Sequence, residues 1–398
     1  NHGKRYNMQL TFWLLLFIVF YTYIGYGILI YIIILVKRRF KTNIADNSSN
    51  FYEPEVTLFI PAFNEKDFVQ QKIENCLELD YPIDKLHVLW VTDGSDDGSV
   101  EELMKYPEIE VMHKPDRRGK IAAMNRGMKY VSDPIVIFTD ANTILPKHVI
   151  YEVVNQFRDA KVGCVSGEKR IYNSENEAAA AAGEGLYWKY ESTLKKLDFE
   201  LYSAVGAAGE LFAVRKELYR DVEPDTLLDD FIISMRICMQ GYKIAYNPDA
   251  YALETSSVNV KEELKRKIRI SAGGIQSVLR LIPLLNFLKY GILSFQYFSH
   301  RVLRWTLTPM CILALFFVNL SLILSPSPAL IYTILFSGQV IFYLLALLGW
   351  ILENRKIKLK FLFIPYYFFI MNLSTYLGFI RLIRKKQSVN WERAKRSI

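Results

Sequence analysis

Acidic residues occur at three places along the chain, near the ends of apolar runs, and together they could do chemistry. Asp93 stands close to Asp96 and Asp97, Asp140 stands alone, and Asp229 and Asp230 form a pair. One carboxylate could hold a divalent cation against a diphosphate leaving group. Another could take the proton of an attacking hydroxyl, and a third could accept hydrogen bonds from a nucleoside. Taken singly, each cluster also fits a turn or a helix cap.

A basic loop with the sequence RRGK at 117–120 could serve the same leaving group. Lys120 could neutralise a phosphate oxygen, and Gly119 gives the loop backbone freedom. An exposed basic loop explains these residues equally well when they are considered alone.

The acidic residues need a scaffold that brings them together. Val56–Phe63, His87–Asp93 and Pro134–Asp140 are short apolar runs, and the helical stretches Lys66–Leu79 and Ile121–Val131 separate them. Buried strands that alternate with helices predict an α/β fold with a mostly parallel sheet covered on both faces. Ligands of such sheets bind beyond the carboxyl ends of the strands, which is where the polar residues lie.

Two long charge-free stretches predict membrane helices on either side of this fold. Tyr6–Val36 has no charge and precedes the basic run KRRFK at 37–41, which predicts a transmembrane helix ending in the cytoplasm. Trp305–Leu352 is also free of charge. Ser-Pro-Ser-Pro at 325–328 interrupts it, as expected for two spans joined by a short turn.

A further apolar stretch, Phe361–Ile380, contains Pro365. It is either a full span, which would leave the basic tail outside, or a re-entrant hairpin, which would return the tail to the cytoplasm. The segment before Trp305 alternates basic and apolar residues, a pattern typical of helices in the membrane interface. The expected parts are an N-terminal transmembrane helix (1–40), the α/β domain (52–260), amphipathic interfacial helices (261–304), C-terminal transmembrane helices (305–381) and a basic cytoplasmic-type tail (382–398).

The composition agrees with a chain that is partly in lipid. Apolar residues make up 51% of it and charged residues 23%, and the net charge is +8. The basic runs adjoin the apolar stretches, and no base-reading module accompanies them, so we expect membrane lipids and no nucleic acid as partners. The cysteines have no metal-ligand spacing and no disulfide framework, which indicates buried thiols.

Short motifs follow one another in a particular order. They are PAFNE at 61–65, VTDGSDDGS at 91–99, RRGK at 117–120, FTDANT at 138–143, GAAGELFAVR at 206–215, LLDDF at 227–231 and GYKIAYNPDA at 241–250. In these motifs and in its apolar stretches the chain resembles the membrane-integrated family 2 glycosyltransferases. That group includes cellulose, chitin, hyaluronan and poly-N-acetylglucosamine synthases. The likeness covers nearly the whole chain.

The resemblance implies a GT-A-type glycosyltransferase domain with transmembrane and interfacial helices, and it implies roles for single residues. The donor, a UDP-sugar, would be bound by Pro61, Ala62, Glu65, Asp93, Lys120, Asp140 and Arg269. Asp93 would contact the uracil or ribose. Asp140 and Asn142 would hold Mg²⁺ or Mn²⁺ at the diphosphate.

On the acceptor side the resemblance implies that Asp230 is the general base, with Asp229 beside it. Gly206, Gly209, Glu210 and Arg266 would shape the acceptor site, the glycines letting a sugar approach the backbone. Direct displacement would invert the anomeric centre and give a β-linkage.

The chain departs from the family pattern at two places. The metal motif, often Asp-x-Asp, reads Asp140-Ala141-Asn142 here. The interfacial motif Gln-x-x-Arg-Trp of the processive synthases has Arg266 at its start and Arg269 in the place of its Arg, but Ile270 replaces the Trp. Ile cannot stack on a sugar. Trp188 and Trp305 could replace the missing Trp, although an anchor in the membrane interface is the commoner role of such a residue.

Three functions fit these features. The first is a polysaccharide synthase in a bacterial-type inner membrane, with a cytoplasmic catalytic domain, that translocates its growing glycan. A pore of so few helices would need a second copy or an accessory subunit. The second is transfer of one sugar to a lipid such as ceramide, diacylglycerol or a polyprenyl carrier. The third is a non-catalytic subunit, which would not need the base Asp230.

Overall fold

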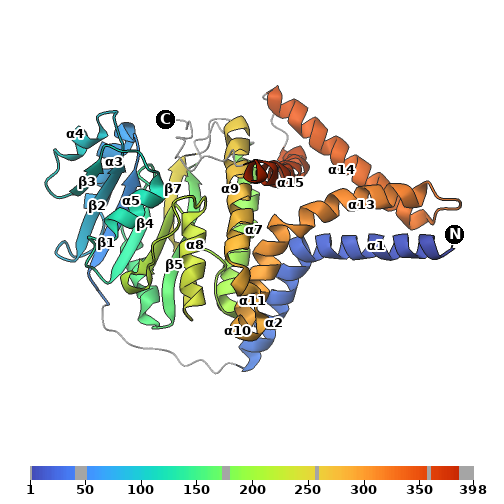
Figure 1. The fold of residues 1–398 in the computed structure, drawn as a ribbon, viewed down its shortest axis with the longest axis horizontal. Helices are drawn as coiled ribbons and strands as arrows, with labels where there is room; N and C mark the ends of the chain where they lie inside the picture. The colour runs from blue at the N-terminus through green and yellow to red at the C-terminus, as the bar shows by residue number, and fades with distance from the viewer. Residues whose placement is uncertain (1, 41–51, 173–179, 256–259, 356–359, 385–398) are drawn as a thin grey trace.

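The computed structural model describes residues 2–40, 52–172, 180–255, 260–355 and 360–384. Most of the expected basic tail at 382–398 therefore lies outside the described residues. Figure 1 shows a sheet domain on one side and a set of long helices on the other, with α2, α7, α9 and α11 between them.

The sheet domain has seven strands in the order β3-β2-β1-β4-β6-β5-β7. The strands are β1 (Val56–Ala62), β2 (Leu86–Asp93), β3 (Glu110–Lys114), β4 (Ile135–Thr139), β5 (Val162–Tyr172), β6 (Leu211–Arg215) and β7 (Lys243–Thr255). β1 to β4 are parallel to one another, β6 is antiparallel to its neighbours β4 and β5, and β7 is parallel to β5. The mostly parallel α/β sheet predicted from the apolar runs is confirmed.

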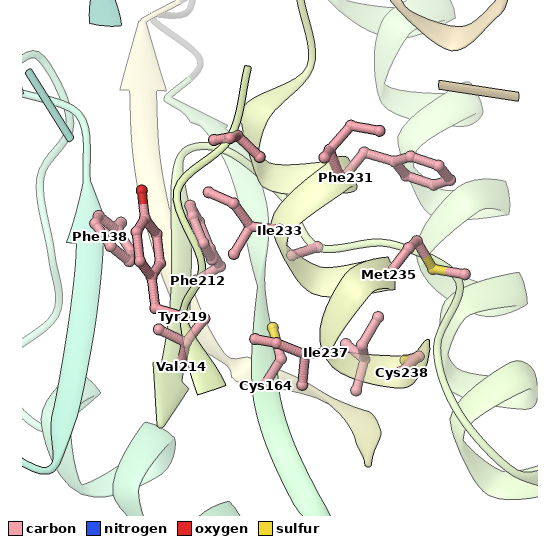
Figure 2. Packing of buried hydrophobic residues seen from close by; sticks show 14 of the residues in the cluster. Phe138, Cys164, Phe212, Val214, Tyr219, Phe231, Ile233, Met235, Ile237 and Cys238 are labelled. Carbon is pink, nitrogen blue, oxygen red and sulfur yellow. The ribbon is translucent and has the colours of Figure 1, made fainter. Parts of the chain in front are cut away.

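Helices cover both faces of the sheet. They are α3 (Lys66–Leu77), α4 (Ser99–Leu103), α5 (Lys120–Gly127), α6 (Val149–Val154), the 3₁₀ turns η2 (Asn155–Arg158) and η3 (Lys216–Leu218), α7 (Ala180–Leu201) and α8 (Asp229–Met239). All seven residues of β1 are buried, as expected for a strand covered on both sides. Phe138 of β4 and Phe212 of β6 stack with ring centroids 4.8 Å apart. Figure 2 shows Ile233 and Ile237 of α8 packed on this side of the sheet, near Phe212 and Cys164.

The remaining helices come from both ends of the chain. They are α1 (His2–Phe20), the π-helical turn η1 (Tyr21–Gly25), α2 (Tyr26–Phe40), α9 (Val260–Arg280), the 3₁₀ turn η4 (Ile282–Leu285), α10 (Phe287–Tyr290), α11 (Ile292–Tyr297), the π-helical turn η5 (Phe298–Val302), α12 (Leu303–Trp305), α13 (Leu307–Ile323), α14 (Leu330–Asn354) and α15 (Lys360–Ile383). Gly3–Phe40, Leu330–Leu352 and Leu362–Ile383 are each long and apolar enough to cross a membrane. A fourth crossing results if Ile292–Trp305 and Leu307–Ile323, bent by 52° at their break, act as one span.

The N-terminal helix does more than face lipid. Its second half packs against α7 of the sheet domain, where Tyr26, Ile30 and Ile34 form one cluster with Leu194 and Leu201. Apolar residues at helical spacing therefore serve a protein contact here. The long charge-free run alone did not distinguish this contact from lipid.

The segment 261–304, which was expected to form interfacial helices, leads directly into α13, a helix of the candidate membrane-spanning pair. α11, η5 and α12 form the first arm of the bent pair, although this arm contains His300, Arg301 and Arg304. His300 is 0% exposed and Arg304 is 7% exposed. These side chains contact a carboxylate of α7, which is why they do not mark a solvated helix face.

The last apolar stretch forms a single helix, α15, with Pro365 in its second turn and no break there. α15 lies against α9: a Cβ on Gly378 would come within 2.7 Å of the Ala272 nitrogen. The hydroxyls of Ser271 and Ser374 are 3.1 Å apart. The small residues let the two backbones approach closely. The broken hairpin considered for this stretch is absent from the described residues.

Candidate active site

Asp93 ends β2 and is held there by the loop that precedes α5. Its Oδ2 accepts hydrogen bonds from the backbone nitrogens of Arg118, at 2.8 Å, and Gly119, at 2.5 Å. Its Oδ1 is buried and accepts no hydrogen bond from the described residues, with Arg126 Nη1 at 3.8 Å. A buried carboxylate oxygen without a donor is costly. It fits a ligand that brings its own N–H or O–H.

Strand β1, which lies next to β2 in the sheet, borders the Asp93 site on its other side. Pro61 and Ala62 are the last residues of the buried strand β1, beside Val91 and Thr92 of β2. Glu65 begins α3, where its carbonyl accepts from the Phe68 nitrogen at 2.9 Å. The structure therefore brings the expected donor-side residues of β1 and β2 to one edge of the sheet.

Two of the acidic residues near Asp93 have structural partners. Asp96 Oδ1 accepts a hydrogen bond from the Asn64 side chain at 2.8 Å. Asp97 Oδ2 accepts one from the Lys66 nitrogen at the start of α3, at 3.1 Å, and Oδ1 accepts one from the Ser99 nitrogen at 3.0 Å. These two carboxylates fit the turn and cap explanation. Asp93 is the member of the cluster that faces the site.

Lys120 connects two of the three acidic sites. Its Nζ lies 3.0 Å from Asp140 Oδ1 and 3.5 Å from Asp229 Oδ2. Burial lowers the pKa of Lys120, but Asp140, Asp229 and Asp230 together outweigh burial and raise the pKa well above its usual value. The lysine is therefore charged, as a group that binds phosphate must be. It also stands at the first position of α5, where backbone N–H groups favour anions.

Asp140 follows β4 and is the residue that fits a divalent metal. Burial, together with Glu210 and Glu254, raises the pKa of Asp140 against the opposite effect of Lys120. A cation would relieve this cost. No group of three or more His, Cys, Asp or Glu among the described residues is arranged to hold a metal by itself. Mg²⁺ commonly binds one or two carboxylates and takes substrate phosphates and water as its other ligands. Asp140, with Asn142 two residues later, fits a metal that arrives with a diphosphate.

Asp230 has the properties of a general base. It is the second residue of α8, next to Asp229. Burial, and then the charge of Asp229, raise the pKa of Asp230 to about 7, with Lys120 acting in the opposite direction. A base with a pKa near the working pH accepts a proton most effectively. A Cβ on Gly209 would lie 3.2 Å from Asp230 Oδ2, so this glycine keeps the space beside the carboxylate open.

Gly206 has a different role in the same loop. Its φ is +89°, and a Cβ there would lie 2.2 Å from the Phe231 ring. The structure gives a steric reason for glycine at both positions, and the approach of a sugar to this loop stays a prediction. The reasons differ: Gly206 is needed for the backbone and for Phe231, whereas Gly209 is needed for access to Asp230.

Glu210 belongs to an ionic group that lies between the loop and α9. Lys169 Nζ is 3.1 Å from Glu210 Oε1 and also pairs with Glu254. Arg266 Nη1 is 3.8 Å from Glu254 Oε2. Despite burial, Lys169 and then Arg266 hold the pKa of Glu210 well below its usual value. Glu210 is therefore an anion paired with Lys169 of β5, and it is connected to Arg266 of α9 through Lys169 and Glu254.

Arg269 lies one turn after Arg266 on α9. Its Nε is buried and donates no hydrogen bond to the described residues. A buried guanidinium nitrogen without an acceptor indicates a site for an anionic ligand. The role of Arg269 toward the diphosphate stays a prediction.

Aromatic residues surround the acceptor side even though position 270 is Ile. Trp305 packs edge-on against Phe231, the residue after the base, with ring centroids 5.0 Å apart. A Cβ on Gly274 of α9 would come within 2.5 Å of the Trp305 ring. Trp188 lies further along, with Lys169 and Lys267 each 5.6 Å from its ring centroid. Trp305 therefore packs directly on α8, the helix that contains Asp230.

Lys72 was missed by the sequence analysis because it resembles any lysine of an amphipathic helix. It is 0% exposed. Its Nζ donates to the Thr143 carbonyl at 2.8 Å and to the Thr143 and Thr139 hydroxyls at 3.2 and 3.4 Å. Thr143 Oγ1 in turn bonds the Asp140 carbonyl at 2.8 Å. Lys72 thus supports the loop that carries Asp140 and Asn142.

Comparison with known proteins agrees with this geometry. The model of the family described as glycosyl transferase family 2 matches residues 57–223. A poly-β-1,6-N-acetyl-D-glucosamine synthase of Staphylococcus aureus is 28% identical over 235 residues, which are 56% of this chain and 56% of that protein. This chain thus matches about half the length of that relative. The synthase of the same name from Staphylococcus epidermidis is 22% identical over 305 residues, 74% of this chain and 73% of the relative.

A solved structure shares the fold over almost all of the chain. It is a mannosyltransferase from Pyrobaculum calidifontis in complex with GDP-mannose and Mn²⁺. The TM-score is 0.71 at 21% identity, and the match covers 96% of this chain and 100% of the other. Residues 57–223 therefore match the family 2 glycosyltransferases in sequence, and the sheet domain has a GT-A-like fold joined to helices that are long enough to cross a membrane. The resemblance read from the motifs is confirmed.

Proposed function

We propose that this protein is an inverting glycosyltransferase of the membrane that builds a β-linked polysaccharide from a UDP-sugar. The observation that carries the proposal is the position of Asp230. The base has a pKa raised to about 7, Gly209 leaves its carboxylate open, and its neighbour Asp229 is 3.5 Å from Lys120. A base and a phosphate-binding cation thus stand on two sides of one small site.

In the proposed reaction an acceptor hydroxyl attacks the anomeric carbon of the donor while the bond from that carbon to the diphosphate breaks. Asp230 takes the hydroxyl proton. Lys120 and Arg269 balance the charge that develops on the departing diphosphate, and Asp93 receives a hydrogen bond from the nucleoside. A divalent metal at Asp140 would supply further charge neutralisation for the diphosphate. Attack opposite the leaving group gives inversion.

The product and the membrane placement are supported by the relatives and by the helices. The Staphylococcus aureus and Staphylococcus epidermidis relatives are named as poly-N-acetylglucosamine synthases. The helices on both sides of the domain support an integral membrane protein, and the basic run at 37–39 supports a catalytic domain on the cytoplasmic side of an inner membrane. Translocation by so few helices would need a second copy of the chain or an accessory subunit.

A second candidate is transfer of a single sugar to a membrane lipid. Ile270 favours it, because it cannot stack on the ring of a growing glycan. Trp305, which packs against Phe231 beside Asp230, comes from the arm that continues into α13. A lipid headgroup could therefore reach the base from the bilayer.

The test uses the full chain in nanodiscs with Mg²⁺ or Mn²⁺. UDP-N-acetylglucosamine, UDP-glucose, UDP-glucuronate, UDP-galactose and GDP-mannose are compared by release of the nucleoside diphosphate and by product size. A glycan of many sugars made from a UDP-sugar supports the synthase, and one sugar on an extracted lipid supports the second candidate. No transfer from any donor, or equal transfer by Asp230→Asn, would overturn the proposal.

A further inference from the structure

A buried ionic cluster lies outside the site, where the membrane helices meet the sheet domain. We call it the junction cluster, and it consists of Tyr26, Glu191, Asp198, His300, Arg301 and Arg304. Glu191 and Asp198, both on α7, are 3% and 0% exposed. His300 and Arg304 come from the arm before α13 and are 0% and 7% exposed. The proposed chemistry uses none of these residues.

Glu191 is the centre of the junction cluster. Its Oε1 lies 2.6 Å from Arg301 Nη1 and 3.1 Å from His300 Nε2. Its Oε2 lies 2.7 Å from Arg304 Nη1. These three partners outweigh burial and hold the pKa of Glu191 well below its usual value. The carboxylate therefore fixes three side chains of one short segment.

The cluster continues to the N-terminal helix through the second ring nitrogen of His300. His300 Nδ1 lies 2.5 Å from Asp198 Oδ2, and the other oxygen of Asp198 accepts a hydrogen bond from the Tyr26 hydroxyl. Gln296 adds a hydrogen bond to the Asp198 carbonyl at 2.7 Å. Side-chain contacts thus join three segments that are far apart in the chain: α2, α7 and the arm that precedes α13.

On its other side the junction cluster contacts the loop Val205–Gly209, which we call the acceptor loop. The Nε of Arg301 donates to the Val205 carbonyl at 3.2 Å. Val205 immediately precedes Gly206, whose neighbour Ala207 is fixed by a hydrogen bond from its nitrogen to Ser234 Oγ at 3.0 Å. One guanidinium therefore binds Glu191 on one side and the first carbonyl of the loop that contains Gly209 on the other.

The backbone is unusual at the same place. The described chain has two π-helical turns, η1 (Tyr21–Gly25) and η5 (Phe298–Val302), and they touch through the hydroxyls of Tyr21 and Ser299, 2.8 Å apart. π-helical turns are rare and occur frequently at functional positions. η5 contains His300 and Arg301, so the inserted turn sets the direction of both side chains.

Stability alone is a poor explanation for such a cluster. Removing several charges from water costs about as much as their mutual attraction returns, and apolar side chains of similar size often do as well. What a hydrogen-bonded ionic cluster adds is a defined geometry. Here that geometry connects a helix that enters the membrane to the loop beside the base.

We propose that Glu191 and Arg301 are positioning residues that hold the Val205–Gly209 loop, and through it the space beside Asp230, in register with the N-terminal membrane helix. The proposal rests on the proposed glycosyl transfer, because it concerns the acceptor side of that site. Neither residue touches the reacting atoms. Their effect is on where the acceptor hydroxyl lies relative to the base.

The test compares Glu191→Gln with Glu200→Gln, a matched change on the same helix at a solvent-exposed ion pair with Arg38. The donor is UDP-N-acetylglucosamine and the acceptor is a β-1,6-linked N-acetylglucosamine pentasaccharide. We expect kcat/KM for the acceptor to fall about tenfold or more in Glu191→Gln, because small displacements of reacting groups lower the rate by such factors. The Kd for UDP and the slow rate of donor hydrolysis by water should both stay within about twofold of the wild-type values. A tenfold change in either would indicate that an interaction with the donor had been lost. Glu200→Gln should match wild type in all three.

Arg301→Lys keeps the test decisive if Glu191→Gln does not fold. Lys keeps the charge near Glu191 but lacks the fork that also reaches the Val205 carbonyl. It should show the same loss toward the acceptor with unchanged binding of UDP. Wild-type acceptor kinetics in Arg301→Lys, or equal losses in UDP binding and acceptor use, would overturn the positioning role. If wild type transfers no sugar from any of the donors compared above, the proposed function fails instead.

Discussion

A Cβ placed on Gly209 would lie 3.2 Å from Oδ2 of Asp230, closer than nearly all real Cβ contacts. The loop of the GAAGE motif and the first turn of α8 thus pack closely against each other at Asp230. Because the approach is to a side-chain oxygen, Asp230 could adjust by a few tenths of an ångström. Such an adjustment changes where the base points without disturbing the core.

The first prediction follows from this contact. Gly209→Ala should lower kcat by about tenfold to a hundredfold, because a displaced base is badly aligned, while the melting temperature stays near that of wild type. Gly206→Ala provides the contrast: with φ of +89° and Phe231 at 2.2 Å it should destabilise the fold by about 2–4 kcal/mol. Turnover and thermal unfolding of both variants check this. Equal loss of stability in the two would contradict it.

A second prediction concerns the base and pH. Since the pKa of Asp230 is raised to about 7, mainly by burial and Asp229, kcat should rise with pH through about 7. Asp230→Asn should lose about a hundredfold to ten-thousandfold in kcat and lose this pH limb, while UDP binding persists. The control is Asp84→Asn, in an exposed loop before β2. A pH limb retained in Asp230→Asn would assign it to another group.

The same pKa predicts a change in stability. The pKa of about 7 in the folded protein exceeds the ordinary carboxyl value of 3.8, so the folded state holds the proton more tightly than the unfolded state does. The stability from this group is present below about pH 4 and is lost as pH rises through about 7. Asp230→Asn should therefore melt at a higher temperature than wild type at pH 8, with a smaller difference at pH 5. A lower melting temperature at pH 8 would contradict this.

A third prediction concerns Lys72 and the metal. Lys72→Met removes the hydrogen bonds that fix Thr139 and Thr143, and so loosens the loop of Asp140. Residues that orient a ligand commonly change metal affinity about tenfold to a hundredfold. Titration of Mn²⁺ in the presence of UDP should show this loss. Lys147→Met, an exposed lysine that follows the same loop, should bind Mn²⁺ like wild type.

A fourth prediction concerns the aromatic residue at the acceptor side. If Trp305 takes the place of the Trp that is absent at position 270, Trp305→Leu should raise the acceptor KM about threefold to tenfold, the range of an aromatic contact, and shorten the product. Trp350, which is 50% exposed on α14, offers the control Trp350→Leu. Product sizing by gel filtration distinguishes them. Identical products from Trp305→Leu and wild type would favour lipid as the acceptor.

Part of the site could be predicted from sequence because parallel strands bring their carboxyl ends to one edge. Asp93 ends β2 and Asp140 follows β4. A residue at the carboxyl end of a parallel strand lies at the ligand-binding edge of the sheet, so the place of both residues could be predicted. The motif order identified the family 2 domain. The long apolar runs likewise predicted helices suited to a membrane, since that signal depends on length and composition alone.

Other features depend on contacts between distant parts of the chain. Arg304 and Glu191 are 113 positions apart, so no local pattern could show that the basic residues before α13 are buried against α7. Lys72 is a surface lysine by helical periodicity and becomes a support of Asp140 only when α3 packs on the β4 loop.

The sequence by itself determined the type of fold, the acidic residues and their order, because strand pattern and motif spacing are local properties. Tertiary structure decided the pKa of Asp230, the predicted base, because that pKa depends on burial and on Asp229 and Lys120. It also decided how the membrane helices reach the acceptor loop. Charged side chains are tolerated in a protein interior only where folding brings oppositely charged partners within a few ångströms. Those distances cannot be derived from the positions of the residues along the chain.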